Sequence, residues 1–94
     1  MEAHEIYRKA IETYGVEAQT KMAIEEMAEL TNALMKFARG RLTVEDIVEE
    51  VADVSVMMQQ LAIIYGQNAV QLQIDYKTQR LAKRLIDHGG PKAD

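Results

Sequence analysis

Two short acidic segments with nearly the same pattern are the part of this sequence best suited to chemistry. Residues 24–30 read Ile-Glu-Glu-Met-Ala-Glu-Leu, and residues 48–54 read Val-Glu-Glu-Val-Ala-Asp-Val. Each segment contains two acidic residues three positions apart, and the four residues are Glu26, Glu29, Glu50 and Asp53. Because residues three apart lie on one face of a helix, two such helices packed together would bring these carboxylates into one cleft.

Four carboxylates in one cleft need compensation, because like charges at short range raise one another's pKa and destabilise the fold. A divalent cation is the simplest compensation. The ligands would all be oxygen atoms, which favours a hard ion, Mg²⁺ first and Mn²⁺ as its substitute. We therefore predict a metal site formed by Glu26, Glu29, Glu50 and Asp53. On a helical wheel, Glu25 and Glu49 point away from this cleft, towards solvent or a partner subunit.

Several basic residues are candidates for binding an anionic ligand that the metal brings in. Lys77 is the strongest, because it interrupts an apolar stripe and a lysine at such a position must reach solvent or a negative partner. Arg80 lies on the flank of that stripe, and Lys36 follows the first acidic segment. These three side chains are therefore candidates for contact with such an anionic ligand.

The elements that must position these residues are helices. Hydrophobic residues recur at helical spacing, which predicts an all-α domain with helices over residues 3–14, 16–39, 44–65 and 68–88, and a tail over 89–94. Thr43 and Asp46 have the spacing of a capping box, and Asn68 is the expected N-cap of the last helix. The short link between the second and third helices predicts antiparallel neighbours.

The hydrophobic stripes predict which side chains form the core. They comprise Ala23, Met27, Leu30, Leu34 and Phe37 in the second helix, and Ile47, Val51, Val54, Met58 and Leu61 in the third. The third helix is also apolar on its remaining sides, and a helix of that kind is normally buried all round. One short chain has too few helices to cover it, so we expect a homodimer or a larger homo-oligomer.

Composition limits the class of protein. The chain has 94 residues, one domain's length, and its net charge of −4 argues against nucleic-acid binding, which requires a basic surface. It has no cysteine, so thiolate metal sites are excluded. Because the sequence shows neither an apolar signal segment nor a membrane-spanning run, we expect a cytoplasmic protein without a membrane partner.

The acidic pattern resembles the MazG-like, all-α nucleoside triphosphate pyrophosphohydrolases. Their signature is E-x-x-E, a spacer and then E-x-x-D, which reads here as Glu26-Met-Ala-Glu29 and Glu50-Val-Ala-Asp53. The resemblance covers residues 16–87 and is closest to the short, single-domain members. The flanking residues that agree are Gln19, Lys36, Arg39, Gly40, Lys77, Arg80 and Arg84.

This resemblance implies a four-helix MazG-like bundle that assembles as a dimer or tetramer. It also implies Mg²⁺-dependent hydrolysis of a nucleoside triphosphate (NTP or dNTP) to the monophosphate and pyrophosphate by metal-activated water. The four acidic residues would hold Mg²⁺, and Glu25 or Glu26 would orient or deprotonate the water. Lys77, Arg80 and Lys36 would contact the phosphates.

Two other interpretations remain open from the sequence. One is a carboxylate-bridged di-metal bundle with redox chemistry, although such bundles usually carry Glu-x-x-His and this chain has Asp53 in place of the histidine. The other is a non-catalytic helical oligomer, or a nucleotide- or partner-binding module, in which the acidic segments are ordinary surface.

Overall fold

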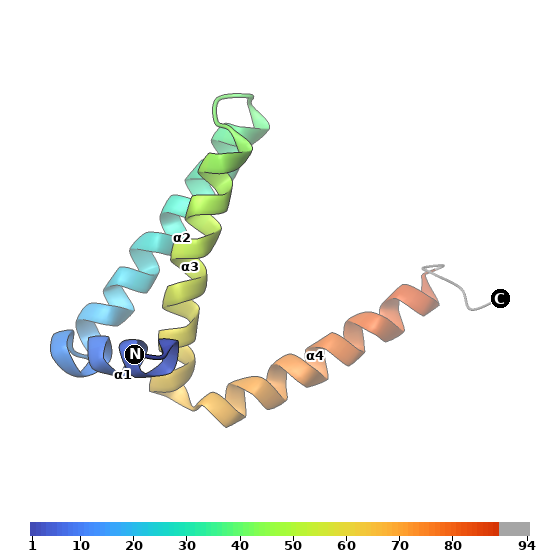
Figure 1. Ribbon diagram of the computed structural model, residues 1–94. Helices are drawn as coiled ribbons and strands as arrows, with labels where there is room; N and C mark the ends of the chain where they lie inside the picture. Colours follow the sequence, from blue (N-terminus) through green and yellow to red (C-terminus); the bar gives the residue numbers. More distant parts are fainter. Residues whose placement is uncertain (89–94) are drawn as a thin grey trace.

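The computed structural model describes residues 1–88, which form four α-helices and no strand. The helices are α1 (Ala3–Tyr14), α2 (Val16–Ala38), α3 (Val44–Tyr65) and α4 (Gln67–Asp87) (Figure 1). The predicted all-α architecture is confirmed, and the helix ends differ by one residue at three places. Helix α2 ends before Arg39, and α4 begins at Gln67 and ends at Asp87. The predicted tail, 89–94, lies outside the described residues.

Gly66 connects α3 directly to α4. Its φ of 119° lies in the region that favours glycine, and this lets the chain change direction within a single residue. The Gly66 N–H donates to the carbonyl of Ala62 (3.0 Å), while its own carbonyl accepts from the Val70 N–H (2.9 Å). Gly66 is thus the C-cap of α3 and the N-cap of α4. The prediction that Asn68 caps α4 was wrong, since Asn68 lies inside the first turn.

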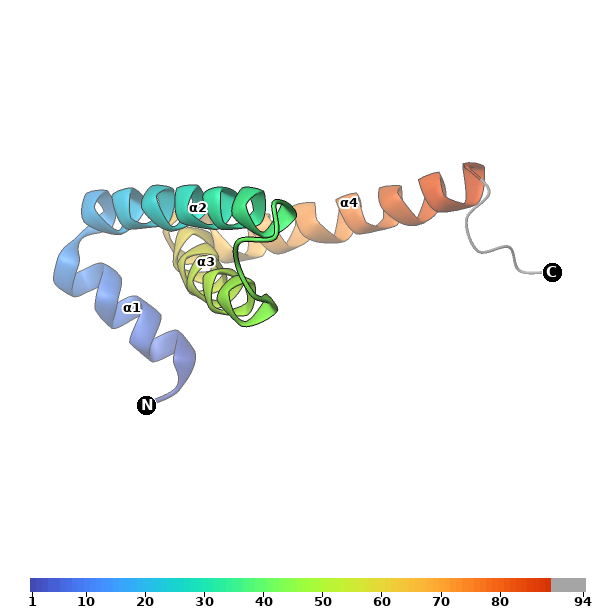
Figure 2. The same ribbon diagram turned by 90° about the horizontal axis from the view of Figure 1, so that it is seen from above.

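Helices α2 and α3 form a long hairpin (Figures 1 and 2). The start of α3 is fixed by Thr43, whose hydroxyl accepts from the Asp46 N–H (3.2 Å). In return, the Asp46 carboxylate accepts from the Thr43 N–H (2.9 Å). This capping box confirms the predicted start of α3 and satisfies backbone donors that the helix itself leaves free.

Most of the covered side chains of the hairpin follow one seam on each helix, with alternating steps of three and four residues. In α2 the seam consists of Gln19, Ala23, Glu26, Leu30 and Ala33. In α3 it consists of Ile47, Glu50, Val54, Met57, Leu61 and Ile64. This spacing is the one by which two long helices pack side by side. Glu26 and Glu50 therefore lie within the α2–α3 seam and not merely beside it.

The predicted core stripes were only partly right. Ala23, Leu30, Ile47, Val54 and Leu61 are covered as predicted. The stripe residues that remain exposed are Met27, Leu34 and Phe37 in α2, and Val51 and Met58 in α3. Each helix is rotated about its axis relative to the prediction, so that polar Gln19 and Gln60 and small Ala33 are buried in the hairpin instead.

Helix α1 packs across the end of the hairpin and contacts both α2 and α3. Helix α4 leaves the end of α3 and extends away from the hairpin (Figure 1), and no residue of Gln67–Asp87 is buried. A hydrogen bond between the side chains of His4 and Gln67 links the beginnings of α1 and α4. Within residues 1–88, no helix has both the length and the apolar character needed to cross a membrane.

Candidate metal centre

Three of the four predicted metal ligands converge in the hairpin. Carboxylate oxygens of Glu26, Glu29 and Glu50 all lie within 4.8 Å of one another. Glu26 and Glu29 come from neighbouring turns of α2, and Glu50 comes from the antiparallel α3. Glu26 and Glu50 are half-buried and Glu29 is exposed, so the cluster begins inside the seam and opens to solvent along one flank.

One carboxylate oxygen of each seam residue, Glu26 and Glu50, has no hydrogen-bond donor among the described residues. Glu26 Oε2 and Glu50 Oε1 are buried and accept no hydrogen bond from any residue that the structure describes. Burial raises the pKa of both carboxyl groups above the ordinary value, and the nearby charges of Glu29 and Asp53 raise it further. A buried acceptor without a donor is destabilising, so the site is suited to taking up a cation or a proton.

The chemistry of these side chains fits a hard divalent cation. All the donor atoms are carboxylate oxygens, the ligand type that Mg²⁺ and Mn²⁺ prefer. Asp53, the fourth predicted ligand, lies outside the closest group of oxygen atoms, but its charge acts on both Glu26 and Glu50. Glu25 is exposed next to the cluster and its charge contributes to the raised pKa of Glu26.

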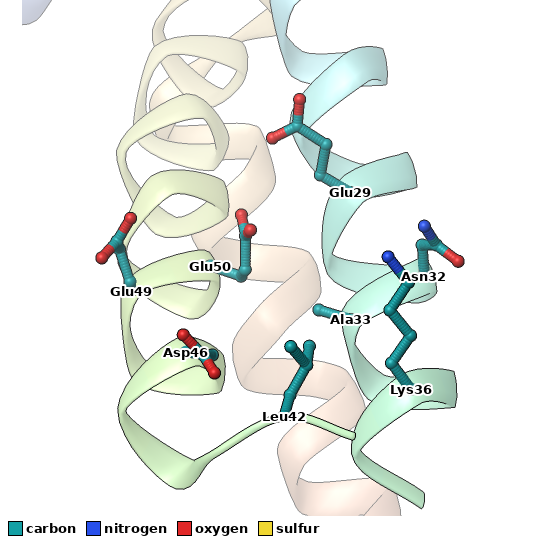
Figure 3. A pocket seen from close by; sticks show the side chains of 8 residues that line it. All are labelled: Glu29, Asn32, Ala33, Lys36, Leu42, Asp46, Glu49 and Glu50. Carbon is teal, nitrogen blue, oxygen red and sulfur yellow. The ribbon is translucent and has the colours of Figure 1, made fainter. Parts of the chain in front are cut away.

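A hollow of about 300 Å³ opens beside the carboxylates. Its lining consists of Glu29, Asn32, Ala33, Lys36, Leu42, Asp46, Glu49 and Glu50. Figure 3 shows Glu29 and Glu50 pointing into the space between α2 and α3, and Glu49 on the outer side of α3. Lys36, one of the predicted phosphate-binding residues, thus lines the hollow beside the carboxylate cluster.

Sequence reasoning did not select Asn32, Asp46 or Glu49 for this hollow. For two of them the sequence contained a signal. Asn32 is three residues after Glu29, and Asp46 is four residues before Glu50, so each shares a helix face with a predicted ligand. Asp46 is also the capping residue of α3. Hydrogen bonds from the Thr43 N–H and hydroxyl lower the pKa of its carboxyl group, which keeps a negative charge on the rim of the hollow.

The other two predicted phosphate-binding residues lie elsewhere in the chain. Lys77 and Arg80 are exposed on α4, and neither contributes to the lining of the hollow. Arg80 lies over the ring of Tyr76, 5.9 Å from its centroid. Because α4 extends away from the hairpin (Figure 1), a single chain does not bring these two side chains to the carboxylates.

Comparisons with protein-family models, with curated proteins and with solved structures found no match. The fold and the site define an all-helical chain with a carboxylate cluster set into a helical hairpin.

Proposed function

We propose that this protein is a Mg²⁺-dependent nucleoside triphosphate pyrophosphohydrolase of the MazG-like type. The observation that carries the proposal is the convergence of Glu26, Glu29 and Glu50, with two buried carboxylate oxygens that have no partner among the described residues. The spaced acidic motifs and their resemblance to the MazG-like signature support the choice of reaction.

Glu26, Glu29 and Glu50 would hold the cation, with Asp53 beside them adding negative charge. A bound Mg²⁺ would neutralise charge on the triphosphate oxygens and lower the pKa of the attacking water. Water attack at the phosphoryl group next to the sugar would release pyrophosphate and leave the nucleoside monophosphate.

The chain's own side chains would carry the remaining tasks. Glu25 or Glu26 would orient the water and accept its proton, and Lys36 would bind a phosphate oxygen at the rim of the hollow. The hollow, about 300 Å³, is at the small end of the roughly 300–1,000 Å³ range of ligand sites. That size suits the triphosphate group, with the base and sugar reaching outward. Lys77 and Arg80 would bind phosphate only if a second chain delivers them.

The direct test measures pyrophosphate release from a panel of NTPs and dNTPs with Mg²⁺ and, separately, with excess EDTA. We expect release from at least one nucleotide with Mg²⁺, partial activity with Mn²⁺ and none with EDTA. If no nucleotide is hydrolysed, the protein is a non-catalytic helical oligomer or binding module. Metal analysis of the purified protein would support the redox interpretation if it found tightly bound iron.

A further inference from the structure

Helices α3 and α4 diverge from Gly66 (Figure 1), and their facing sides are apolar. A cavity of about 420 Å³ lies in the angle between the two helices. Its lining includes Met58 and Ala62 of α3, and Val70 and Ile74 of α4. The two apolar sides are therefore directed at each other near Gly66, with the cavity between them.

Both apolar sides continue beyond the cavity as stripes with steps of three or four residues. The α3 stripe consists of Val48, Val51, Ser55, Met58 and Ala62. The α4 stripe consists of Val70, Ile74, Lys77, Leu81 and Leu85. All of these side chains except half-buried Ala62 and Val70 are exposed. Such spacing is that of helix surfaces that pack side by side along their length.

Counting outward from Gly66, the two stripes have the same order of residue types. At four, eight and fifteen residues from Gly66, each stripe has an apolar side chain. At eleven residues, the α3 stripe has Ser55 and the α4 stripe has Lys77, the single polar residue of each stripe. Because all α-helices have the same rise per residue, these positions would form common layers if the two helices lay side by side. The layers are Ala62 with Val70, Met58 with Ile74, Ser55 with Lys77, Val51 with Leu81 and, at the far end, Val48 with Leu85.

Gly66 allows α4 to pivot without loss of the helix caps. Its N–H donates to the carbonyl of Ala62 in α3, and its carbonyl accepts from the Val70 N–H in α4. The two backbone torsion angles of Gly66 lie between these groups, so rotation about them moves α4 and leaves both hydrogen bonds intact. Glycine has access to a wide range of both angles. The hydrogen bond between the His4 and Gln67 side chains joins α4 at the residue next to this pivot, where displacement is smallest.

We propose that α4 closes onto α3 within a single chain, by rotation at Gly66, so that the α3 and α4 stripes pack against each other. The open arrangement is extended, with a radius of gyration of 16.9 Å against about 12 Å for a compact domain of this length. Helix α4 has no buried residue in it, so little packing is lost when α4 moves. Closure buries apolar side chains of both stripes, which favours the closed arrangement.

Closure also explains a lysine in the middle of an apolar stripe. The Ser55 hydroxyl donates to the carbonyl of Val51 at 2.7 Å, so its oxygen can still accept a hydrogen bond. In the closed arrangement the Lys77 ammonium group is the donor that Ser55 faces. The long side chain of Lys77 can at the same time keep its charge near solvent.

The distribution of charge favours closure as well. The half of α3 that is far from Gly66, residues 44–53, contains five acidic side chains. The far half of α4, residues 75–87, contains four basic and two acidic side chains. Closure brings a net positive segment beside a net negative one, at a separation below the Debye length of about 8 Å to 10 Å in ordinary salt.

Paired cysteines test the register, because the natural chain has no cysteine. We expect the variant with both Ser55→Cys and Lys77→Cys to form a disulfide within one chain under mild oxidation. The matched control combines Val56→Cys with Lys77→Cys: Val56 is exposed at nearly the same height of α3, but is rotated roughly 100° from Ser55. The control should form its link at least tenfold more slowly. Equal rates in the two variants, or no intrachain link in the first, would overturn the proposed closure.

Protein concentration separates closure from the pairing of two chains. An intrachain disulfide gives cross-linked monomers, and their fraction should not change on dilution. Cross-linked dimers that disappear on dilution would show that another copy occupies the space between the helices, and would refute closure within one chain.

A second layer keeps the test decisive if the first variant does not fold, which circular dichroism would show. Val51→Cys with Leu81→Cys lies four residues further from Gly66 on both helices, and it should also link within one chain. Absence of that link in a folded variant would contradict the register. None of these measurements requires nucleotide or metal, so the inference and the proposed activity fail independently.

Discussion

Glu26 and Glu50 lie at seam positions that would hold apolar side chains if the α2–α3 pair served stability alone. Each has one buried oxygen without a hydrogen-bond donor among the described residues, and each is close to further negative charge. Such an arrangement destabilises the folded chain. The unfavourable placement of these two residues is therefore the main physical argument that the hairpin binds a cation.

Under the proposed function, replacing one of these two carboxylates should strongly reduce turnover. Loss of a residue that only supports a metal ligand typically lowers activity by roughly 10–100-fold. Because Glu50 is itself a proposed ligand, we expect Glu50→Gln to lower pyrophosphate release by at least that factor. Circular dichroism should show an unchanged helix content, because the amide has nearly the same shape. Glu17→Gln, at an exposed position of α2, is the control and should keep full activity. Unimpaired hydrolysis by Glu50→Gln would place the metal elsewhere.

The raised pKa values of Glu26 and Glu50 predict how stability depends on pH without metal. Because their folded-state pKa lies above the ordinary value of 4.5, folding is opposed once these groups ionise, and stability falls as the pH rises through the folded pKa. In EDTA at pH 7, the melting temperature of the natural chain should be lower than that of Glu50→Gln. This difference in melting temperature should shrink towards pH 5.

Mg²⁺ should reverse that difference at pH 7, because a ligand that binds only the folded state raises the melting temperature. Thermal melts of both proteins, with and without Mg²⁺, measure both effects. If Mg²⁺ does not change the melting temperature of the natural chain, the proposed metal site is contradicted.

At the scale of the helices, the sequence predicted local features well and rotations poorly. The capping box at Thr43 and the predicted ends of α1 at Tyr14 and α3 at Tyr65, each followed by a glycine, involve neighbours in sequence, so residue type determines them. The rotation of α3 about its axis depends on which of its apolar sides packs on α2, and the sequence is apolar on more than one side. Asn68 was wrongly chosen as a cap because Gly66, with its positive φ, already serves both helices.

The capping box should contribute measurably to the stability of α3. Thr43→Ala removes the acceptor for the Asp46 N–H, and we expect the free energy of unfolding to fall by about 1 kcal/mol. Thr31→Ala is a suitable control, because the Thr31 hydroxyl donates only to the carbonyl of Met27 within α2. Chemical denaturation of the two variants gives the comparison, and equal values would mean that the cap has no net effect.

A buried amide pair joins α2 to α3 near the end of the hairpin. Gln19 Nε2 donates to Gln60 Oε1 at 2.7 Å, and the two side chains are only 8% and 4% exposed. Gln60→Leu should lower the free energy of unfolding by about 1–3 kcal/mol, because it leaves the Gln19 amide without its acceptor. The double change to Leu should recover much of this loss, since it removes both polar groups. Additive losses in this cycle would contradict a direct interaction.

At the scale of the whole molecule, the candidate site divides into predictable and unpredictable parts. Glu26, Glu29 and Glu50 were predicted because an antiparallel hairpin with matching motifs brings them together. The positions of Lys77 and Arg80 depend on the direction in which α4 leaves Gly66, and helical periodicity contains no information about that direction. The apolar third helix led us to expect a partner chain, and this expectation stays a prediction.

The small number of buried residues has a consequence for how the folded state depends on protein concentration. Only Gln19, Ala23, Ala33, Met57 and Gln60 are buried in the described chain, which is a small core for a domain of this length. If pairing completes the core, folding and assembly are one reaction, and stability follows mass action. The melting temperature should then rise with each tenfold increase in chain concentration, as calorimetry at several concentrations would show. At low expression the chain would then be mostly unfolded, and folded protein would accumulate steeply above a threshold concentration.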